Sequence, residues 1–242
     1  MKLAVFNGSP REKTSNTTVL LDNFLNGYMT NDGNSYELGY LANEKEADKN
    51  IELFKEADRV LIAFPLYFDS MPANVKTFIE SLEPLCLRSG NPGIGFIIQS
   101  GFPESDHSMY VESYLEKLAK RLGCKYSGTV IRGAFETIRV PFMIDNIFHK
   151  IFIAGGKITN MGRVGHFFNT EKLYKKIYRL GMTFGKTGEF DKKIVQQLAK
   201  PEKLSRFGSC LFRFVGKHLY WNILLKRNNA YDKRFDTPYA DQ

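Results

Sequence analysis

Apolar, β-rich segments alternate with amphipathic helical segments over the first 135 residues, and this alternation limits the chain to very few folds. The predicted strands cover residues 2–6, 35–41, 59–64, 94–99 and 127–133, and the predicted helices cover 17–28, 49–57, 73–82 and 108–122. Strands separated by helices form parallel sheets that are covered on both faces, with right-handed crossovers. The sequence therefore predicts a three-layer α/β sandwich with a five-stranded parallel sheet in the order 2-1-3-4-5.

This strand order places a ligand pocket at the carboxyl ends of the first, third and fourth strands, beside the switch point of the sheet. Three loops follow these strands, at residues 7–17, 65–71 and 100–104. We expect these loops to build the functional site.

The first loop carries more hydrogen-bond donors than a strand-to-helix turn needs. Ser9, Ser15 and Thr17 supply hydroxyl groups, Asn16 opens the following helix, and Arg11 adds a charged fork suited to phosphate. The first amides of a helix have no backbone partner and lie at the positive end of the helix dipole. The loop therefore predicts an anion-binding site, and the alternative is an ordinary turn with Ser15 as N-cap.

Two segments resemble the flavodoxin-like NAD(P)H-dependent FMN reductases, and the resemblance covers roughly residues 1–135. The first loop contains Gly8-Ser9-Pro10-Arg11 and then Ser15-Asn16-Thr17. The second segment reads Pro65-Leu66-Tyr67-Phe68-Asp69-Ser70-Met71-Pro72-Ala73, followed by Lys76-Thr77-Phe78. Both segments lie in loops that the predicted fold brings together.

The resemblance implies bound FMN, and it distributes the site residues over the three loops. The phosphate would be held by Ser9, Arg11, Ser15, Asn16 and Thr17, and the flavin ring by Pro65, Leu66, Tyr67 and Phe68, with Ser100 and Gly101 on the opposite wall. Core packing is the alternative for the two aromatic side chains. The resemblance assigns no general acid or base, because hydride passes directly from the nicotinamide to the flavin.

The implied function is an oxidoreductase that takes hydride from NADPH or NADH. Its electrons would pass to a quinone, a free flavin, a nitro or azo compound, or a metal ion. The alternative is an electron carrier like flavodoxin, although the formal net charge of +8 differs from the acidic character of typical flavodoxins. A third possibility is an interaction protein that has lost FMN.

Composition limits the remaining function classes. The cysteines at 86, 124 and 210 and the histidines at 107, 149, 166 and 218 are scattered, so no metal site is predicted. No apolar run approaches the roughly 18 residues of a membrane span, and no signal peptide is recognised, so we expect a cytoplasmic protein. No nucleic-acid motif accompanies the positive charge, which favours basic solvated helix faces.

Residues 136–242 are predicted to form a mainly helical extension to a domain at 1–135. Helices are expected at 170–181, 191–198 and 205–226, after an aromatic stretch at 140–153 and a glycine-rich stretch at 155–165. The extension would pack on its own domain or on a partner subunit in a homodimer. The alternative for the basic, aromatic helix at 205–226 is contact with an anionic membrane surface.

Overall fold

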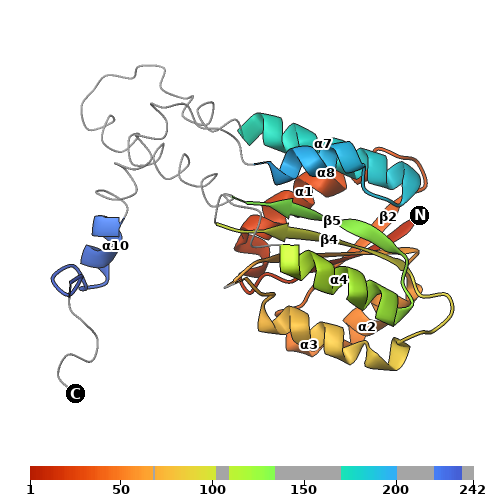
Figure 1. Ribbon diagram of the computed structural model, residues 1–242, viewed down its shortest axis with the longest axis horizontal. Helices are drawn as coiled ribbons and strands as arrows, with labels where there is room; N and C mark the ends of the chain where they lie inside the picture. Colours follow the sequence, from red (N-terminus) through yellow and green to blue (C-terminus); the bar gives the residue numbers. More distant parts are fainter. Residues whose placement is uncertain (68, 102–108, 134–169, 201–220, 236–242) are drawn as a thin grey trace. The chain divides into compact units, whose positions relative to one another are not determined.

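The computed structural model describes residues 1–67, 69–101, 109–133, 170–200 and 221–235. The chain divides into two compact units, Met1–Pro201 and Glu202–Gln242. The first unit contains one sheet of five strands in the order β2-β1-β3-β4-β5, and every neighbouring pair is parallel (Figure 1). The predicted strand order and the α/β sandwich are therefore confirmed.

The strands differ from their predicted bounds by no more than one residue at either end, and they are all short. Their bounds are β1 Lys2–Asn7, β2 Ser35–Tyr40, β3 Arg59–Pro65, β4 Gly93–Gln99 and β5 Tyr126–Arg132. Strand β4 is buried along its whole length, as expected for a strand that is covered on both faces.

Helices cover both faces of the sheet (Figure 1). One face carries α2 (Ala47–Glu56), α3 (Ala73–Ser81) and α4 (Met109–Leu122). The other face carries α1 (Asn16–Tyr28), α7 (Thr170–Thr187) and α8 (Lys192–Ala199).

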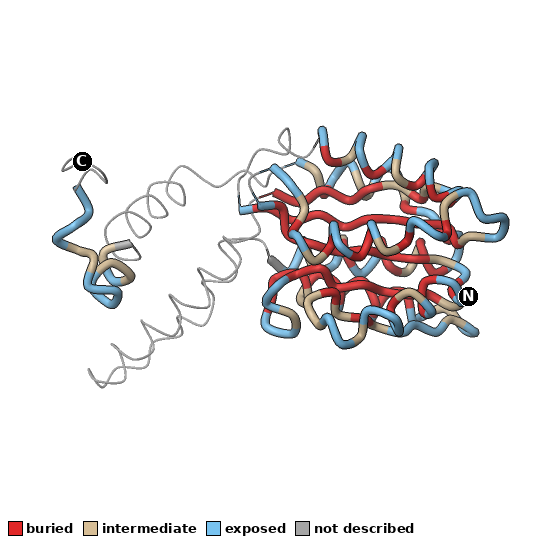
Figure 2. The backbone as a smooth tube through the Cα atoms, turned by 90° about the horizontal axis from the view of Figure 1, so that it is seen from below, coloured by how far each residue is buried: buried red, intermediate tan, exposed pale blue. Residues whose placement is uncertain are grey.

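The alternation of side chains along the strands produces two hydrophobic cores, one on each face of the sheet. Figure 2 shows the buried residues running along the strands, with exposed residues on the outer sides of the helices. In β1, Ala4 and Phe6 belong to the core beneath α2, α3 and α4, whereas Leu3 and Val5 belong to the core beneath α1 and α7. The second core also takes four buried side chains from α7, namely Leu173, Ile177, Leu180 and Phe184. Helix α7 therefore supplies core that the first 135 residues lack.

Helix α7 contacts α1 backbone to backbone, and two glycines permit this approach. A Cβ on Gly181 would lie 1.9 Å from the Phe24 carbonyl oxygen, and a Cβ on Gly27 would lie 1.9 Å from the Tyr178 carbonyl oxygen. No side chain fits at either position. Each helix therefore presents a glycine to the backbone of the other.

The predicted end of this helix at residue 181 is wrong, because α7 continues to Thr187. Gly181 is an interior glycine whose missing side chain admits α1. The helix ends instead at Gly188, which has a φ of +69° and donates its N–H to the Phe184 carbonyl oxygen at 2.7 Å. A left-handed glycine after the last turn is the common way to end a helix.

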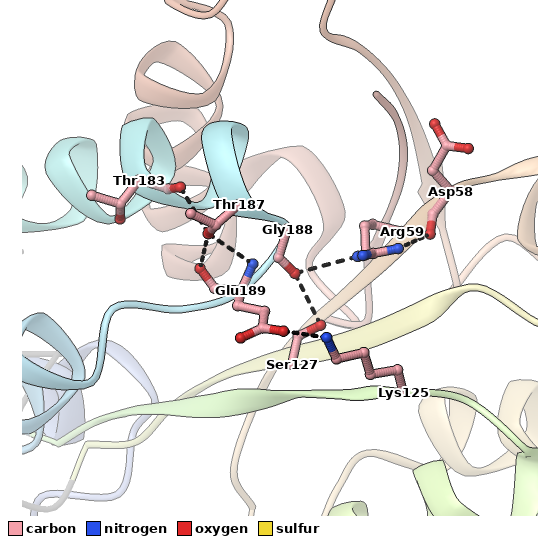
Figure 3. Close-up of polar contacts among 8 residues, drawn as sticks. All are labelled: Asp58, Arg59, Lys125, Ser127, Thr183, Thr187, Gly188 and Glu189. Carbon is pink, nitrogen blue, oxygen red and sulfur yellow. Dashed lines mark hydrogen bonds and ion pairs between the residues drawn. The ribbon is translucent and has the colours of Figure 1, made fainter.

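The end of α7 is attached to the beginnings of β3 and β5 (Figure 3). The Gly188 carbonyl oxygen accepts hydrogen bonds from Arg59 Nε at 3.3 Å and from Ser127 Oγ at 3.1 Å. Lys125 and Glu189 form an ion pair beside these bonds. These contacts join α7 to the edge of the sheet at which β3 and β5 begin.

The boundary between the two units lies after Pro201, whereas the sequence places a boundary at residue 135. Helices α7 and α8 are part of the first unit because their apolar faces complete its second core. The predicted aromatic stretch at 140–153, the glycine-rich stretch at 155–165 and most of the predicted helix at 205–226 lie outside the described residues.

The described part of the second unit is a short helix followed by a turn. Helix α10 spans Trp221–Arg227, and the Arg234 guanidinium lies 4.0 Å from the centre of the Tyr231 ring. Lys226 Nζ lies 5.1 Å from the same ring centre. Among the helices of the described residues, none is long and apolar enough to cross a membrane.

Candidate functional site

The three loops that the sequence selects are brought to one edge of the sheet. They follow β1, β3 and β4, which are consecutive neighbours in the sheet. Backbone hydrogen bonds connect each loop to the next strand: Gly8 N to Ala63 O at 2.7 Å, Leu66 N to Gln99 O at 2.8 Å, and Ser100 N to Arg132 O at 2.9 Å. The carboxyl edge of the sheet therefore carries a continuous surface of loop backbone.

The first loop leaves β1 through a glycine that lies tightly against the adjacent helix. A Cβ on Gly8 would lie 2.2 Å from Val75 Cγ2 and 3.1 Å from Phe64 Cβ. The Gly8 carbonyl oxygen accepts a hydrogen bond from Asn74 Nδ2 at 3.1 Å. A larger residue at position 8 would therefore require the Val75 side chain to shift.

Ser15 is the N-cap of α1, as the alternative interpretation of the sequence expected. Its Oγ accepts the Thr18 amide at 3.1 Å and donates to the Glu12 carbonyl oxygen at 2.6 Å. The hydroxyl proton of Ser15 is therefore used inside the loop, and other groups of the loop remain for a ligand.

Two buried polar atoms of the first turn of α1 have no hydrogen-bond partner among the described residues. They are Asn16 Oδ1 and Thr17 Oγ1, on residues that are 3% and 0% exposed. A buried polar atom without a partner costs stability, so such atoms cluster where a ligand or an ordered water completes the bonding. The two ends of the Asn16 amide are isosteric, so its nitrogen can take the same place.

Ser9 and Arg11 lie in the same loop and differ in exposure. Ser9 is 1% exposed and its Oγ accepts the Arg11 amide at 3.4 Å. The Arg11 side chain is exposed, and it forms no ion pair with any of the described residues. A guanidinium in this position offers a charged, bidentate donor to an anion in the loop.

The charge of the first loop is held at its surface. Lys13 Nζ lies 6.0 Å from the centre of the Tyr40 ring. Burial raises the pKa of Tyr40, and the carboxylates of Asp22 and Glu12 raise it further, so this phenol stays neutral at physiological pH. Tyr40 therefore places no negative charge beside the cations of the first loop.

The second loop begins with Pro65 and Leu66, which are both buried. Tyr67 and Ser70 then exchange two backbone hydrogen bonds of 2.9 Å, which closes a tight turn. Tyr67 is 45% exposed, so it is not a core residue. Phe68 lies outside the described residues.

The third loop contributes Ser100, which is 5% exposed, and Gly101, which is exposed. Residues 102–108, including His107, lie outside the described residues. Lys76, which follows the second loop in α3, is exposed, and its Nζ lies 3.8 Å from Glu80 Oε1.

Two residues with unusual backbone conformations occur in these loops. Glu12 has a φ of +43° in the first loop, and Asp69 has a φ of +59° in the second. Non-glycine residues adopt this region rarely, and they concentrate at functional sites where surrounding contacts hold them.

Two polar residues that shape the first loop, Asn7 and Asn74, are not singled out by the sequence pattern. Asn7 is fully buried and binds both the Ser9 amide and Thr18 Oγ1, and Asn74 holds the Gly8 carbonyl group. The available signal was an asparagine at the inner end of an apolar strand, directly before Gly8. A polar residue in such a place requires hydrogen-bond partners.

Residues 1–83 match the family model described as flavodoxin-like fold, so the resemblance noted in the sequence is confirmed at the level of the fold. No curated protein matches the sequence.

Solved structures with the same fold share little sequence with this chain. An FMN-dependent NADH-azoreductase from Bacillus anthracis is 13% identical and covers 76% of this chain and 100% of its own, with a TM-score of 0.52. The apo form of an NADH:FMN oxidoreductase is 11% identical and covers 83% of this chain and 96% of its own, with a TM-score of 0.52. A Streptococcus mutans protein is 15% identical, covers 76% of this chain and 100% of its own, and has a TM-score of 0.50.

Proposed function

We propose that this flavodoxin-like chain binds FMN and oxidises NADH or NADPH, passing the electrons to a small-molecule acceptor. The acceptor class is a quinone, an azo or nitro compound, a free flavin or a metal ion. The observation that carries the proposal is the pair of unpartnered buried polar atoms on Asn16 and Thr17, at the start of α1. Structural neighbours described as an FMN-dependent NADH-azoreductase and an NADH:FMN oxidoreductase add support.

The first loop fits the phosphate of FMN. Ser9 and Thr17 offer hydroxyl groups, Asn16 offers its side chain and its helix-start amide, and Arg11 offers a charged fork. A helix start without intrahelical partners favours a dianion. Ser15 contributes as the cap that fixes the first turn of the helix.

The flavin ring would lie against the second and third loops. Pro65 and Leu66 fix the beginning of the second loop, the exposed Tyr67 offers aromatic contact together with Phe68, and Ser100 and Gly101 form the opposite wall. When bound, FMN supplies a ring that accepts a hydride from a nicotinamide. The residues of the chain then have to orient the ring and exclude water, and no general acid or base is assigned.

Anaerobic titration of FMN-loaded protein with NADH and with NADPH tests this function. We expect either nucleotide to bleach the flavin absorbance rapidly. A flavin that binds but stays oxidised with both nucleotides supports an electron carrier like flavodoxin. A protein that binds no flavin contradicts both assignments.

Replacement of Thr17 by valine separates ligand binding from stability. Valine has the same shape and removes a buried hydroxyl group without a partner, so we expect the apo protein to gain up to about 1 kcal/mol of unfolding free energy. The same variant should bind FMN on the order of tenfold more weakly, because it lacks a phosphate donor. Urea unfolding and fluorescence titration measure the two effects, and Thr17→Ser is the control that restores the hydroxyl group. A Thr17→Val protein with lower stability and unchanged affinity contradicts the assignment.

The homodimer implied by the resemblance is part of this proposal. Both subunits would line the flavin site, and the partner would be a second copy of the chain. Light scattering of the purified protein tests this state, and a monomer contradicts it. We propose no nucleic-acid partner, and contact between the 205–226 segment and an anionic membrane surface stays the alternative to docking.

A further inference from the structure

The first loop contains a chain of hydrogen bonds that joins the strand before it to the helix after it. Asn7, the last residue of β1, donates from Nδ2 to Thr18 Oγ1 at 3.0 Å. Thr18 Oγ1 in turn donates to the Glu12 carbonyl oxygen at 2.8 Å. We call these three residues the Asn7 relay. It connects the strand, the loop and the first turn of α1.

The chemistry of the groups fixes the direction of the Asn7 relay. The Ser9 amide can only donate, and it lies 2.9 Å from Asn7 Oδ1, so the oxygen end of this side chain faces the loop. The nitrogen end therefore faces Thr18, whose oxygen must accept. The hydroxyl group of Thr18 can then donate to the Glu12 carbonyl oxygen at 2.8 Å, and the same hydroxyl oxygen also lies 3.1 Å from Ser15 Oγ.

Three hydrogen bonds of the first loop share one acceptor, the Glu12 carbonyl oxygen. It accepts the Thr18 hydroxyl at 2.8 Å, the Ser15 hydroxyl at 2.6 Å and the Ser15 amide at 3.1 Å. Glu12 has a φ of +43°, a conformation that costs free energy in a non-glycine residue. The hydroxyl donors hold this strained residue, and with it the curve of the loop.

The two ends of the Asn7 relay lie beside the groups that the proposed function assigns to phosphate. Asn7 binds the backbone of Ser9, and Thr18 follows Thr17 in the helix. The Asn7 relay therefore fixes the distance between the part of the loop that contains Ser9 and the start of α1 that contains Thr17.

We propose that Asn7 and Thr18 are positioning residues that hold the first loop in its phosphate-binding shape before a ligand arrives. The inference rests on the proposed function of this loop. A preorganised loop binds more tightly because no ordering cost accompanies binding. Neither residue is required to touch the ligand.

Thr18→Val is the decisive variant, because valine keeps the shape of threonine and removes the hydroxyl group that links Asn7 to Glu12. Thr18 is half-buried in the first turn of α1, so the substitution leaves the two cores intact. Thr18→Ser is the matched control that retains the relay. Two measurements are made on each protein: amide hydrogen exchange of the apo form over residues 7–18, and the dissociation constants of FMN and riboflavin.

We expect faster amide exchange at Ser9 and Arg11 in Thr18→Val, and a dissociation constant for FMN on the order of tenfold higher. The constant for riboflavin, which has no phosphate, should stay unchanged, and Thr18→Ser should behave like the natural protein. Unchanged exchange rates, or an unchanged ratio of FMN to riboflavin affinity, overturn the positioning role. A natural protein that binds neither flavin overturns the proposed function, and the exchange rates then decide whether the relay holds the loop.

Discussion

Gly181→Ala is expected to lower the free energy of unfolding by on the order of 3 kcal/mol, because the added methyl group meets backbone rather than a side chain. Its Cβ would lie 1.9 Å from the Phe24 carbonyl oxygen and 3.0 Å from the Tyr28 amide nitrogen. The helices α1 and α7 must then separate, and the second core opens along Phe24 and Phe184, whose ring centres lie 5.6 Å apart. Urea unfolding followed by circular dichroism measures the loss.

The sign of this effect is diagnostic. In an exposed helix, replacing glycine by alanine gains about 1 kcal/mol through helix propensity. Gly185→Ala is the matched control in the same helix, because its Cβ would meet backbone much less closely: the Tyr28 carbonyl oxygen lies 2.9 Å away, against 1.9 Å for the Phe24 carbonyl oxygen at Gly181. Its two nearer neighbours, Asn31 Nδ2 at 2.5 Å and Asn34 Nδ2 at 2.8 Å, are side-chain ends. We expect the loss in Gly185→Ala to be clearly smaller. A Gly181→Ala protein of natural or higher stability contradicts the backbone contact between α1 and α7.

The double variant Ser9→Ala/Arg11→Ala should bind FMN on the order of a hundredfold more weakly, while its fold is retained. The variant removes a buried hydroxyl group and an exposed guanidinium from the first loop. Hydrogen bonds to a charged phosphate are stronger than those between neutral groups, which is why the effect is large. Fluorescence quenching of FMN measures the affinity, and circular dichroism checks the fold.

Lys13→Ala controls for the loss of charge, because it removes one cation from the same loop. Lys13 points its Nζ towards Tyr40, with 6.0 Å between Nζ and the ring centre. We expect a much smaller effect on FMN affinity from this variant. If the double variant binds FMN as tightly as the natural protein, the phosphate site lies elsewhere.

The sheet was predictable because each strand is recognisable from its own residues. The apolar run at 59–64 is nearly identical to β3, and its side chains are buried on both faces as a central strand requires. The glycine-containing turn at residues 90–93 marks the beginning of β4, and Gly123 marks the boundary between α4 and β5. Parallel order then follows from alternation with helices.

The place of α7 was not predictable from local patterns. Its apolar side chains show that α7 is amphipathic, but they do not determine which helix it packs against. In the sequence alone, a glycine at position 181 is typical of a helix end. The structure shows that it lies inside α7, where its missing side chain allows α1 to pack closely. The partner of α7 lies far earlier in the chain than α7 itself. The hydrogen bond from Asn31 Nδ2 to Met182 O, for example, joins residues 151 positions apart.

Residue types and short-range patterns were sufficient to predict the strand order and the three loops at one edge of the sheet. The folded arrangement was needed to show that Ser15 is used as a cap, that Asn7 and Thr18 are hydrogen-bonded to each other across the loop, and that α7 completes the second core. Such roles depend on which atoms lie within hydrogen-bond or van der Waals distance after folding, and residues far apart in the chain meet only then.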